Sequence, residues 1–86
     1  MEIDYAQIPE HTLYGIHQYI EHHIPPGHFL EAVFSNDLRE AFGRADEENI
    51  AAMFHIVAYL YNKVPGNCWG SPEKVRQWLK QKGDSL

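Results

Sequence analysis

The segment from residue 46 to residue 65 constrains the fold of this chain more than any other stretch. Its apolar side chains recur every three or four residues, the period of one face of an α-helix, and they are Ile50, Met53, Phe54, Val57, Leu60, Tyr61 and Val64. Asp46 precedes these residues as an N-cap, and two acidic residues follow it in the first turn, where the helix dipole favours anions. Pro65-Gly66 ends the pattern. The sequence therefore predicts one long central helix over about 46–64, against which the rest of the chain packs.

Three further segments carry helical patterns of their own. The first begins at Ile8-Pro9-Glu10, where proline suits the first helical position, and ends at Pro25-Pro26. The second covers residues 27–42. Because Ser35-Asn36-Asp37 competes there for backbone hydrogen bonds, one helix and two helices that break near Asn36 are both open alternatives. The last segment begins at Ser71-Pro72-Glu73 and ends at Gly83.

These segments, with no strand alternation between them, predict an all-α fold. A chain of 86 residues has no room for two cores, so we expect a compact bundle of about four to five short helices in one domain, residues 1–86. Residues 1–7 are expected to form an N-terminal arm that packs back through Ile3 and Tyr5, and residues 83–86 a frayed C-terminus. Gly43 is the expected C-cap of the second segment.

Composition narrows the classes of partner. The formal net charge of −5 argues against general binding to DNA or RNA, which needs a positive field. No apolar run approaches the roughly 20 residues of a membrane span. The single cysteine, Cys68, excludes an internal disulfide framework and fits a reducing cytoplasm. We therefore expect a cytoplasmic protein that binds neither nucleic acid in general nor membranes.

The residues with catalytic or metal-binding chemistry do not form a recognisable site. The six histidines lack the spacing of three or four residues that places metal ligands on one helix face, so no metal site is expected, although pH sensitivity remains open. Cys68 has no neighbouring base, and the acids at 46–48 are explained by a helix start. The sequence predicts a protein that is not an enzyme and needs no cofactor.

Two groups of residues are candidate ligand contacts. Trp69, Ser71 and Lys74 place an aromatic face, a hydroxyl and a cation at the start of the last helix, where free backbone N–H groups attract anions. The alternative is a well-capped helix with Trp69 in the core. Asn36, with Arg39 and Arg44, interrupts an apolar segment, and these side chains either cap one another or line a pocket.

Four tyrosines do not all fit the apolar stripes, and those that remain on the outside predict an interface, since exposed tyrosine is enriched where proteins meet. They are Tyr5, Tyr14, Tyr19 and Tyr59.

The chain also resembles a family of small proteins encoded by tailed bacteriophages and prophages of proteobacteria. The resemblance covers about residues 8–83 and rests on separate blocks, chiefly Ile8-Pro9-Glu10-His11-Thr12, Ile24-Pro25-Pro26-Gly27, Asn36-Asp37-Leu38, Arg44-Ala45-Asp46 and Cys68-Trp69-Gly70-Ser71-Pro72-Glu73-Lys74-Val75. It implies a phage accessory protein that acts in the host cytoplasm, and it implies no particular mechanism.

Two functions are compatible with this resemblance. The first is a non-catalytic anti-defence or host-takeover protein that binds and inhibits a host protein. The alternative is a homo-oligomeric sponge that sequesters an anionic nucleotide signal between its subunits through Ser71, Trp69 and Lys74, with help from Arg39 or Arg44.

Overall fold

The computed structural model describes the backbone of residues 2–84 and the side chains of residues 2–81. This part of the chain is helical and contains no strand, which confirms the all-α prediction. Its elements are a short 3₁₀ helix, η1 (Tyr5–Gln7), followed by α1 (Glu10–His22), α2 (His28–Phe34), α3 (Leu38–Arg44), α4 (Glu47–Ala51), α5 (Met53–Lys63) and α6 (Pro72–Asp84). The predicted fraying of the last residues lies partly outside this range, because residues 85 and 86 are not described.

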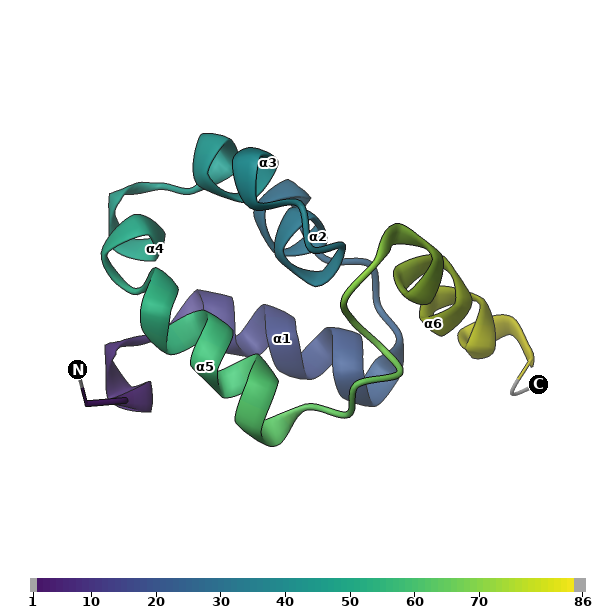
Figure 1. Cartoon of the computed structure of the whole chain (residues 1–86). Helices are drawn as coiled ribbons and strands as arrows, with labels where there is room; N and C mark the ends of the chain where they lie inside the picture. Colours follow the sequence, from purple (N-terminus) through teal and green to yellow (C-terminus); the bar gives the residue numbers. More distant parts are fainter. Residues whose placement is uncertain (1, 85–86) are drawn as a thin grey trace.

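The helices form an elongated bundle with extents of 41 × 23 × 20 Å. In Figure 1, α5 lies in front of α1 along the lower side, α2 and α3 pair along the upper side, and α6 extends to the right toward the C-terminus. Helices α1 and α5 are in contact, because Nε2 of His17 lies 2.9 Å from the hydroxyl of Tyr59. The core joins all of these layers through fully buried side chains, among them Ile16, Tyr19, Phe34, Ile56, Leu60 and Cys68. The long loop between α5 and α6 contributes Cys68 and therefore closes one side of the core.

The segment 27–42 is two helices, which settles the open alternative. Helix α2 ends at Phe34, and Asn36 adopts a left-handed conformation (φ 62°) that turns the chain. The backbone N–H of Asp37 donates to the carbonyl of Ala32 at 2.9 Å, and the Asp37 carboxylate then caps α3 by accepting from the N–H of Glu40. The polar residues that interrupt the apolar pattern are therefore used to make this turn.

The prediction that Gly43 is a C-cap is wrong. Helix α3 continues through Gly43 to Arg44, and the chain leaves the helix at Ala45 in an extended conformation (φ −75°, ψ 139°). An extended exit needs no left-handed residue, so the glycine has no conformational role at this end.

The predicted central helix is interrupted. Asp46 is its N-cap, as expected, because its carboxylate accepts from the N–H of Asn49 at 2.8 Å. At Ala52 the backbone departs from helical geometry (φ −98°, ψ 4°) and separates α4 from α5. Hydrogen bonds still cross this point, from Ala52 N–H to the Glu48 carbonyl and from Ile56 N–H to the Ala52 carbonyl. Together with the split of segment 27–42, this break gives six α-helices among the described residues.

The apolar face predicted for this segment is only partly the buried face. The buried side chains are Ala52, Met53, Ile56, Leu60 and Val64. Four members of the predicted face are exposed instead: Ile50, Phe54, Val57 and Tyr61. Apolar residues cover a larger part of the helix circumference than the part that faces the protein core. Their period therefore did not identify which face of the helix is buried.

Helix α6 is attached to the end of α1 by a reciprocal pair of side-chain hydrogen bonds. The indole Nε1–H of Trp78 donates to the carbonyl of Tyr19 at 2.8 Å. The Nδ1 of His23 lies 2.8 Å from the carbonyl of Trp78, so this nitrogen carries the proton and donates. His23 ends α1 in a left-handed conformation and packs on the Trp78 ring, with centroids 4.3 Å apart.

Gly15 allows α1 and α2 to approach closely. A β-carbon at this position would lie 2.9 Å from Cδ1 of Leu30, closer than atoms in contact normally come. The absent side chain of Gly15 therefore makes room for Leu30 of α2 against α1.

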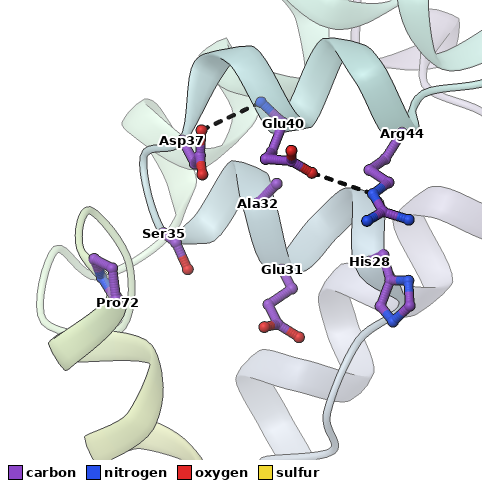
Figure 2. A pocket seen from close by; sticks show the side chains of 8 residues that line it. All are labelled: His28, Glu31, Ala32, Ser35, Asp37, Glu40, Arg44 and Pro72. Atoms are coloured by element: carbon purple, nitrogen blue, oxygen red, sulfur yellow. Dashed lines mark hydrogen bonds and ion pairs between the residues drawn. The ribbon is translucent and has the colours of Figure 1, made fainter.

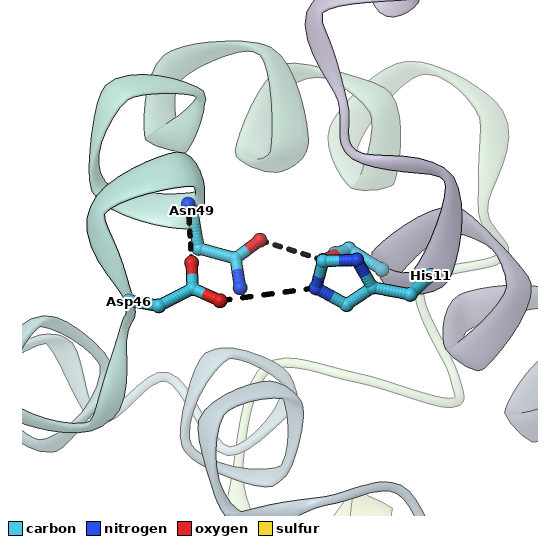
Figure 3. A network of polar contacts seen from close by, with 4 residues as sticks. His11, Asp46 and Asn49 are labelled. Atoms are coloured by element: carbon cyan, nitrogen blue, oxygen red, sulfur yellow. Dashed lines mark hydrogen bonds and ion pairs between the residues drawn. The ribbon is translucent and has the colours of Figure 1, made fainter.

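A small polar network joins α1 to the start of α4 (Figure 3). The hydroxyl of Thr12 donates to Oδ1 of Asn49 at 2.6 Å, and both side chains are buried. Asn49 is fixed from the other side by the Asp46 cap, and His11 lies within 3.9 Å of the same carboxylate. The network satisfies the polar groups where the two helices meet.

Replacing Thr12 by Val is expected to lower the free energy of unfolding by about 1–2 kcal/mol, because it leaves a buried amide oxygen without its donor. Urea denaturation of the purified proteins measures the change. Thr12→Ser keeps the hydroxyl and is the matched control, so equal losses in both variants would contradict this role of the hydrogen bond.

Candidate binding surface

Three of the six predicted ligand contacts line one groove. Asn36, Trp69 and Lys74 are brought together with Tyr61, Val64, Gly66 and Gly70 around a volume of about 450 Å³, which we call the aromatic groove. Tyr61 was predicted to face the core, yet it is 80% exposed and forms the edge of this groove. Two aromatic rings and an amine are thus available to one ligand.

Ser71 serves as the cap of α6. Its hydroxyl accepts from the backbone N–H of Lys74 at 3.2 Å, as the capped-helix alternative predicts. The Lys74 amine donates to the carbonyl of Gly66 at 3.0 Å and closes the loop over the helix start. That bond uses one of its three N–H donors, so Lys74 retains the capacity to bind an anion.

Arg44 lies elsewhere, in an acidic pocket of about 330 Å³ that is lined by His28, Glu31, Ala32, Ser35, Asp37, Glu40, Arg44 and Pro72 (Figure 2). The Arg44 Nε donates to Glu40 Oε2 at 3.2 Å, one turn away on α3. Two further carboxylates line the pocket, so its field opposes an anion. Arg39 is exposed on α3 and lines neither this pocket nor the aromatic groove. The structure therefore does not join these arginines to Trp69 and Lys74.

A further surface feature is a wide, open apolar groove that the sequence analysis missed. It has a volume of about 610 Å³, and its lining residues are Ile3, Leu38, Phe42, Met53, Phe54, Val57, Ala58, Tyr61 and Asn62. None of these residues is charged. Met53 is buried, whereas Ile3, Leu38, Phe42, Phe54, Val57 and Tyr61 are each between 39% and 80% exposed. Single exposed apolar residues are ordinary, but six gathered around one hollow make this surface a candidate binding site.

The groove has a floor and two walls. Phe54, Val57, Ala58 and Tyr61 follow one face of α5 and form the floor. Leu38 and Phe42, one turn apart on α3, form one wall. The pattern that could have revealed the floor is the heptad-like spacing of 50, 54, 57 and 61, but it overlaps with the apolar residues that enter the core.

The N-terminal arm supplies the second wall through Ile3. It is held on α5 by the Asp4 N–H, which donates to Nδ1 of His55 at 3.0 Å, and by Asn62, whose side chain donates to the Tyr5 hydroxyl. The Tyr5 and Tyr59 rings also meet edge to face, with centroids 5.3 Å apart. Tyr5 therefore packs onto the body as expected, whereas Ile3 is 45% exposed at the groove.

The tyrosines are distributed differently from the prediction. Tyr14 is exposed on α1, while Tyr5 and Tyr59 are half-buried against each other. Tyr19 is fully buried, so the prediction of a surface position is wrong for this residue. Its burial is possible because its hydroxyl donates to an acceptor inside the protein, the carbonyl of Cys68 at 2.7 Å.

Cys68 is a buried thiol in the loop that leads to α6. It donates to the carbonyl of Pro65, and burial raises its pKa although Lys74 acts in the opposite direction. The thiolate is therefore a minor species at neutral pH, which favours a structural role. Among the described residues, no three side chains of His, Cys, Asp or Glu are placed to hold a metal ion.

A thiol reagent is expected to modify Cys68 at least about tenfold more slowly in the native protein than in urea, because both burial and the raised pKa suppress the reactive thiolate. Mass spectrometry of time points measures both rates. Equal rates would show that the thiol is accessible and would contradict its placement in the core.

Comparison of the chain with protein-family models, curated proteins and solved structures finds no match. Within the described residues, every helix is too short or too polar to cross a membrane.

Proposed function

We propose that this protein is a non-catalytic binding module that acts on a partner protein through the apolar groove. The observation that carries the proposal is the uncharged groove itself, with six large apolar side chains exposed around it. Burying such surface supplies about 25 cal/mol for each Å² removed from water, which is the main driving force of protein association. The groove is rich in aromatic residues, which carry much of the binding energy at protein interfaces.

The chemistry of the remaining side chains supports a function without catalysis. The one thiol is buried and protonated, and Arg44 is paired with Glu40. Thr12 and Asn49, the two polar residues of the buried set, satisfy each other. A catalytic group needs an activating neighbour in an open site, and these groups are already used in structural contacts.

The partner that fits the resemblance is a host protein. A phage accessory protein that takes over or disarms its bacterial host acts in the host cytoplasm, and inhibition by contact requires only a surface. The resemblance motivates this choice of partner, and the apolar groove supplies the surface.

The test compares three versions of the protein as bait in a bacterial lysate. A partner is expected to be retained by the wild type and by Tyr14→Asp, a matched surface control on α1, and lost with Val57→Asp in the groove floor. With the purified partner, Val57→Asp is expected to raise Kd at least about 100-fold, because it buries an unpaired carboxylate. A partner that Val57→Asp retains, or the lack of any captured protein, contradicts the proposal.

The second candidate function is sequestration of an anionic nucleotide, favoured by the aromatic groove. Trp69 and Lys74, which the sequence suggests for this ligand, meet there beside Tyr61 and Asn36, a residue of the second candidate group. A base would stack on an aromatic ring while a phosphate meets the amine. In this function the protein is a homo-oligomer whose subunits enclose the ligand.

A thermal shift assay with a panel of cyclic nucleotides and nucleotide sugars tests this candidate. One nucleotide is expected to raise the Tm of the wild type and not that of Lys74→Ala, because a ligand stabilises only the state that binds it. Light scattering at two protein concentrations measures the oligomer. A monomer whose Tm no nucleotide changes contradicts this function and leaves the protein-binding function standing.

A further inference from the structure

The apolar groove and the aromatic groove are parts of one continuous surface. A smaller hollow between them is lined by Val33, Asn36, Asp37, Leu38, Ala41, Met53, Val57 and Trp69. It shares Leu38, Met53 and Val57 with the apolar groove and shares Asn36 and Trp69 with the aromatic groove. Tyr61 belongs to both grooves. A ligand can therefore contact apolar residues from Phe54 onward and reach Lys74 at the far end.

This surface favours a bound segment whose backbone N–H and C=O groups are already hydrogen-bonded within the segment itself. Polar groups are scarce along the floor and walls, where the lining of the apolar groove offers the Asn62 amide and the Tyr61 hydroxyl. On the two helical sides of the groove, α3 and α5, the backbone groups are bonded within the helices and offer no strand edge for pairing. The arm at Ile3 is not helical and contributes one residue to the lining. An extended peptide that lies on these two helices would bury backbone N–H and C=O groups without partners, which weakens its binding. A helix forms these bonds within itself and presents only side chains.

The charged residues near the aromatic groove favour one orientation of the bound segment. Of the described residues that line the three hollows, only Asp37 and Lys74 are charged. The Asp37 carboxylate accepts from the N–H of Glu40 at the start of α3, where the helix dipole partly compensates its charge. Lys74 keeps free N–H donors and is the complementary partner for an anion.

We infer that the partner segment is an amphipathic helix of about three turns, with an acidic residue or carboxyl terminus at the end that lies over Lys74. This inference rests on the proposed function and names the chemistry of its partner. The floor positions 54, 57, 58 and 61 extend over about 10 Å of α5, at 1.5 Å per residue, which two turns of the bound helix cover. The third turn reaches Trp69 and Lys74.

Selection from a displayed library of random peptides tests the inference without knowledge of the natural partner. The full-length protein is the bait, and peptides that also bind Val57→Asp are discarded. The enriched peptides are expected to carry apolar residues three and four positions apart and Asp or Glu toward one end, and to become helical on binding by circular dichroism. Extended peptides, or helical peptides without an acidic end, would overturn the inference.

A charge exchange on one selected peptide supplies the control. Lys74→Glu is expected to raise Kd of the acidic peptide about tenfold, and Lys74→Met to raise it less, since reversal adds repulsion to the lost attraction. Replacing the acidic residue of the peptide by Lys is expected to restore affinity for Lys74→Glu. Equal affinity of wild type and Lys74→Glu, or absence of this rescue, overturns the inference but leaves groove binding intact.

The remaining outcomes separate the inference from the function on which it rests. If no peptide depends on Val57, both the groove function and the helical partner are rejected. If light scattering shows a dimer of the unliganded protein that Val57→Asp dissociates, a second copy of the chain occupies the groove, and the inference is overturned in favour of self-association.

Discussion

Replacing Phe34 by Ala is expected to lower the free energy of unfolding by about 3–5 kcal/mol, whereas Phe54→Ala is expected to change it by about 1 kcal/mol or less. The same atoms are removed in both variants. Phe34 is fully buried and stacks on Tyr19 with ring centroids 4.3 Å apart, so its removal leaves a cavity and breaks an aromatic pair. Phe54 is 44% exposed in the apolar groove, so its removal leaves no enclosed cavity.

Urea denaturation of the two variants and the wild type measures both changes. A protein of this size has a stability of roughly 0.05–0.15 kcal/mol per residue, so Phe34→Ala can be unfolded without urea. Phe34→Leu is therefore included, with an expected loss of about 1–2 kcal/mol. Similar losses for Phe34→Ala and Phe54→Ala would mean that Phe54 is buried as well, and the apolar groove would not be a free surface.

The amino-acid sequence predicts the helices of this chain better than it predicts which of their apolar side chains are buried. The period of apolar residues predicted the helical segments correctly, because the spacing of side chains around a helix is a local property. It placed Phe54 and Val57 on the packed face and left out Ile56, which is fully buried beside Leu60, since all four are apolar and close together along α5. Which of them is inside depends on where α1 and α2 pack, and that is decided by contacts distant in sequence.

Local capping was also predictable. Asp46 and Ser71 accept from the N–H groups three residues later, as their positions before apolar patterns indicate. Gly43 was misjudged because a helix can end in an extended residue without glycine, and nothing in the sequence distinguishes this exit from the left-handed one.

The candidate site was predictable only in part. Trp69, Lys74 and Asn36 were selected for their chemistry, and the structure places them around one groove. Arg44 was selected for its charge, but its ion pair with Glu40 depends on the length of α3, which was not predicted. The apolar groove was missed because its walls come from three separated segments, so no contiguous motif records it.

Replacing Tyr19 by Ala is expected to lower the free energy of unfolding by about 3–5 kcal/mol, and Tyr19→Phe by about 1–3 kcal/mol. The ring is fully buried between α1, α2 and the loop before α6, and its hydroxyl donates to the Cys68 carbonyl. Phenylalanine keeps the ring and leaves that buried carbonyl without its donor. Tyr14→Phe, at an exposed position on α1, is the matched control and is expected to have little effect.

The same hydroxyl predicts how stability depends on alkaline pH. Burial, with a smaller contribution from the Cys68 thiol, raises the pKa of Tyr19 well above its usual range. A group whose pKa is raised in the native state contributes stability that is complete below its unfolded pKa, near 10 for tyrosine, and is lost as pH rises above that value. The expected loss is up to about 1.4 kcal/mol per pH unit for this group.

Urea denaturation between about pH 8 and pH 11 measures this loss, and Tyr19→Phe is expected to show a flatter decline than wild type above about pH 10. Burial raises the pKa of Cys68 as well, so part of the decline begins at lower pH and persists in Tyr19→Phe. Because Tyr14→Phe retains the buried phenol, it is expected to follow the wild-type curve. A Tyr19→Phe curve parallel to that of the wild type would show that the phenol ionises equally in both states, and it would remove Tyr19 from the buried core.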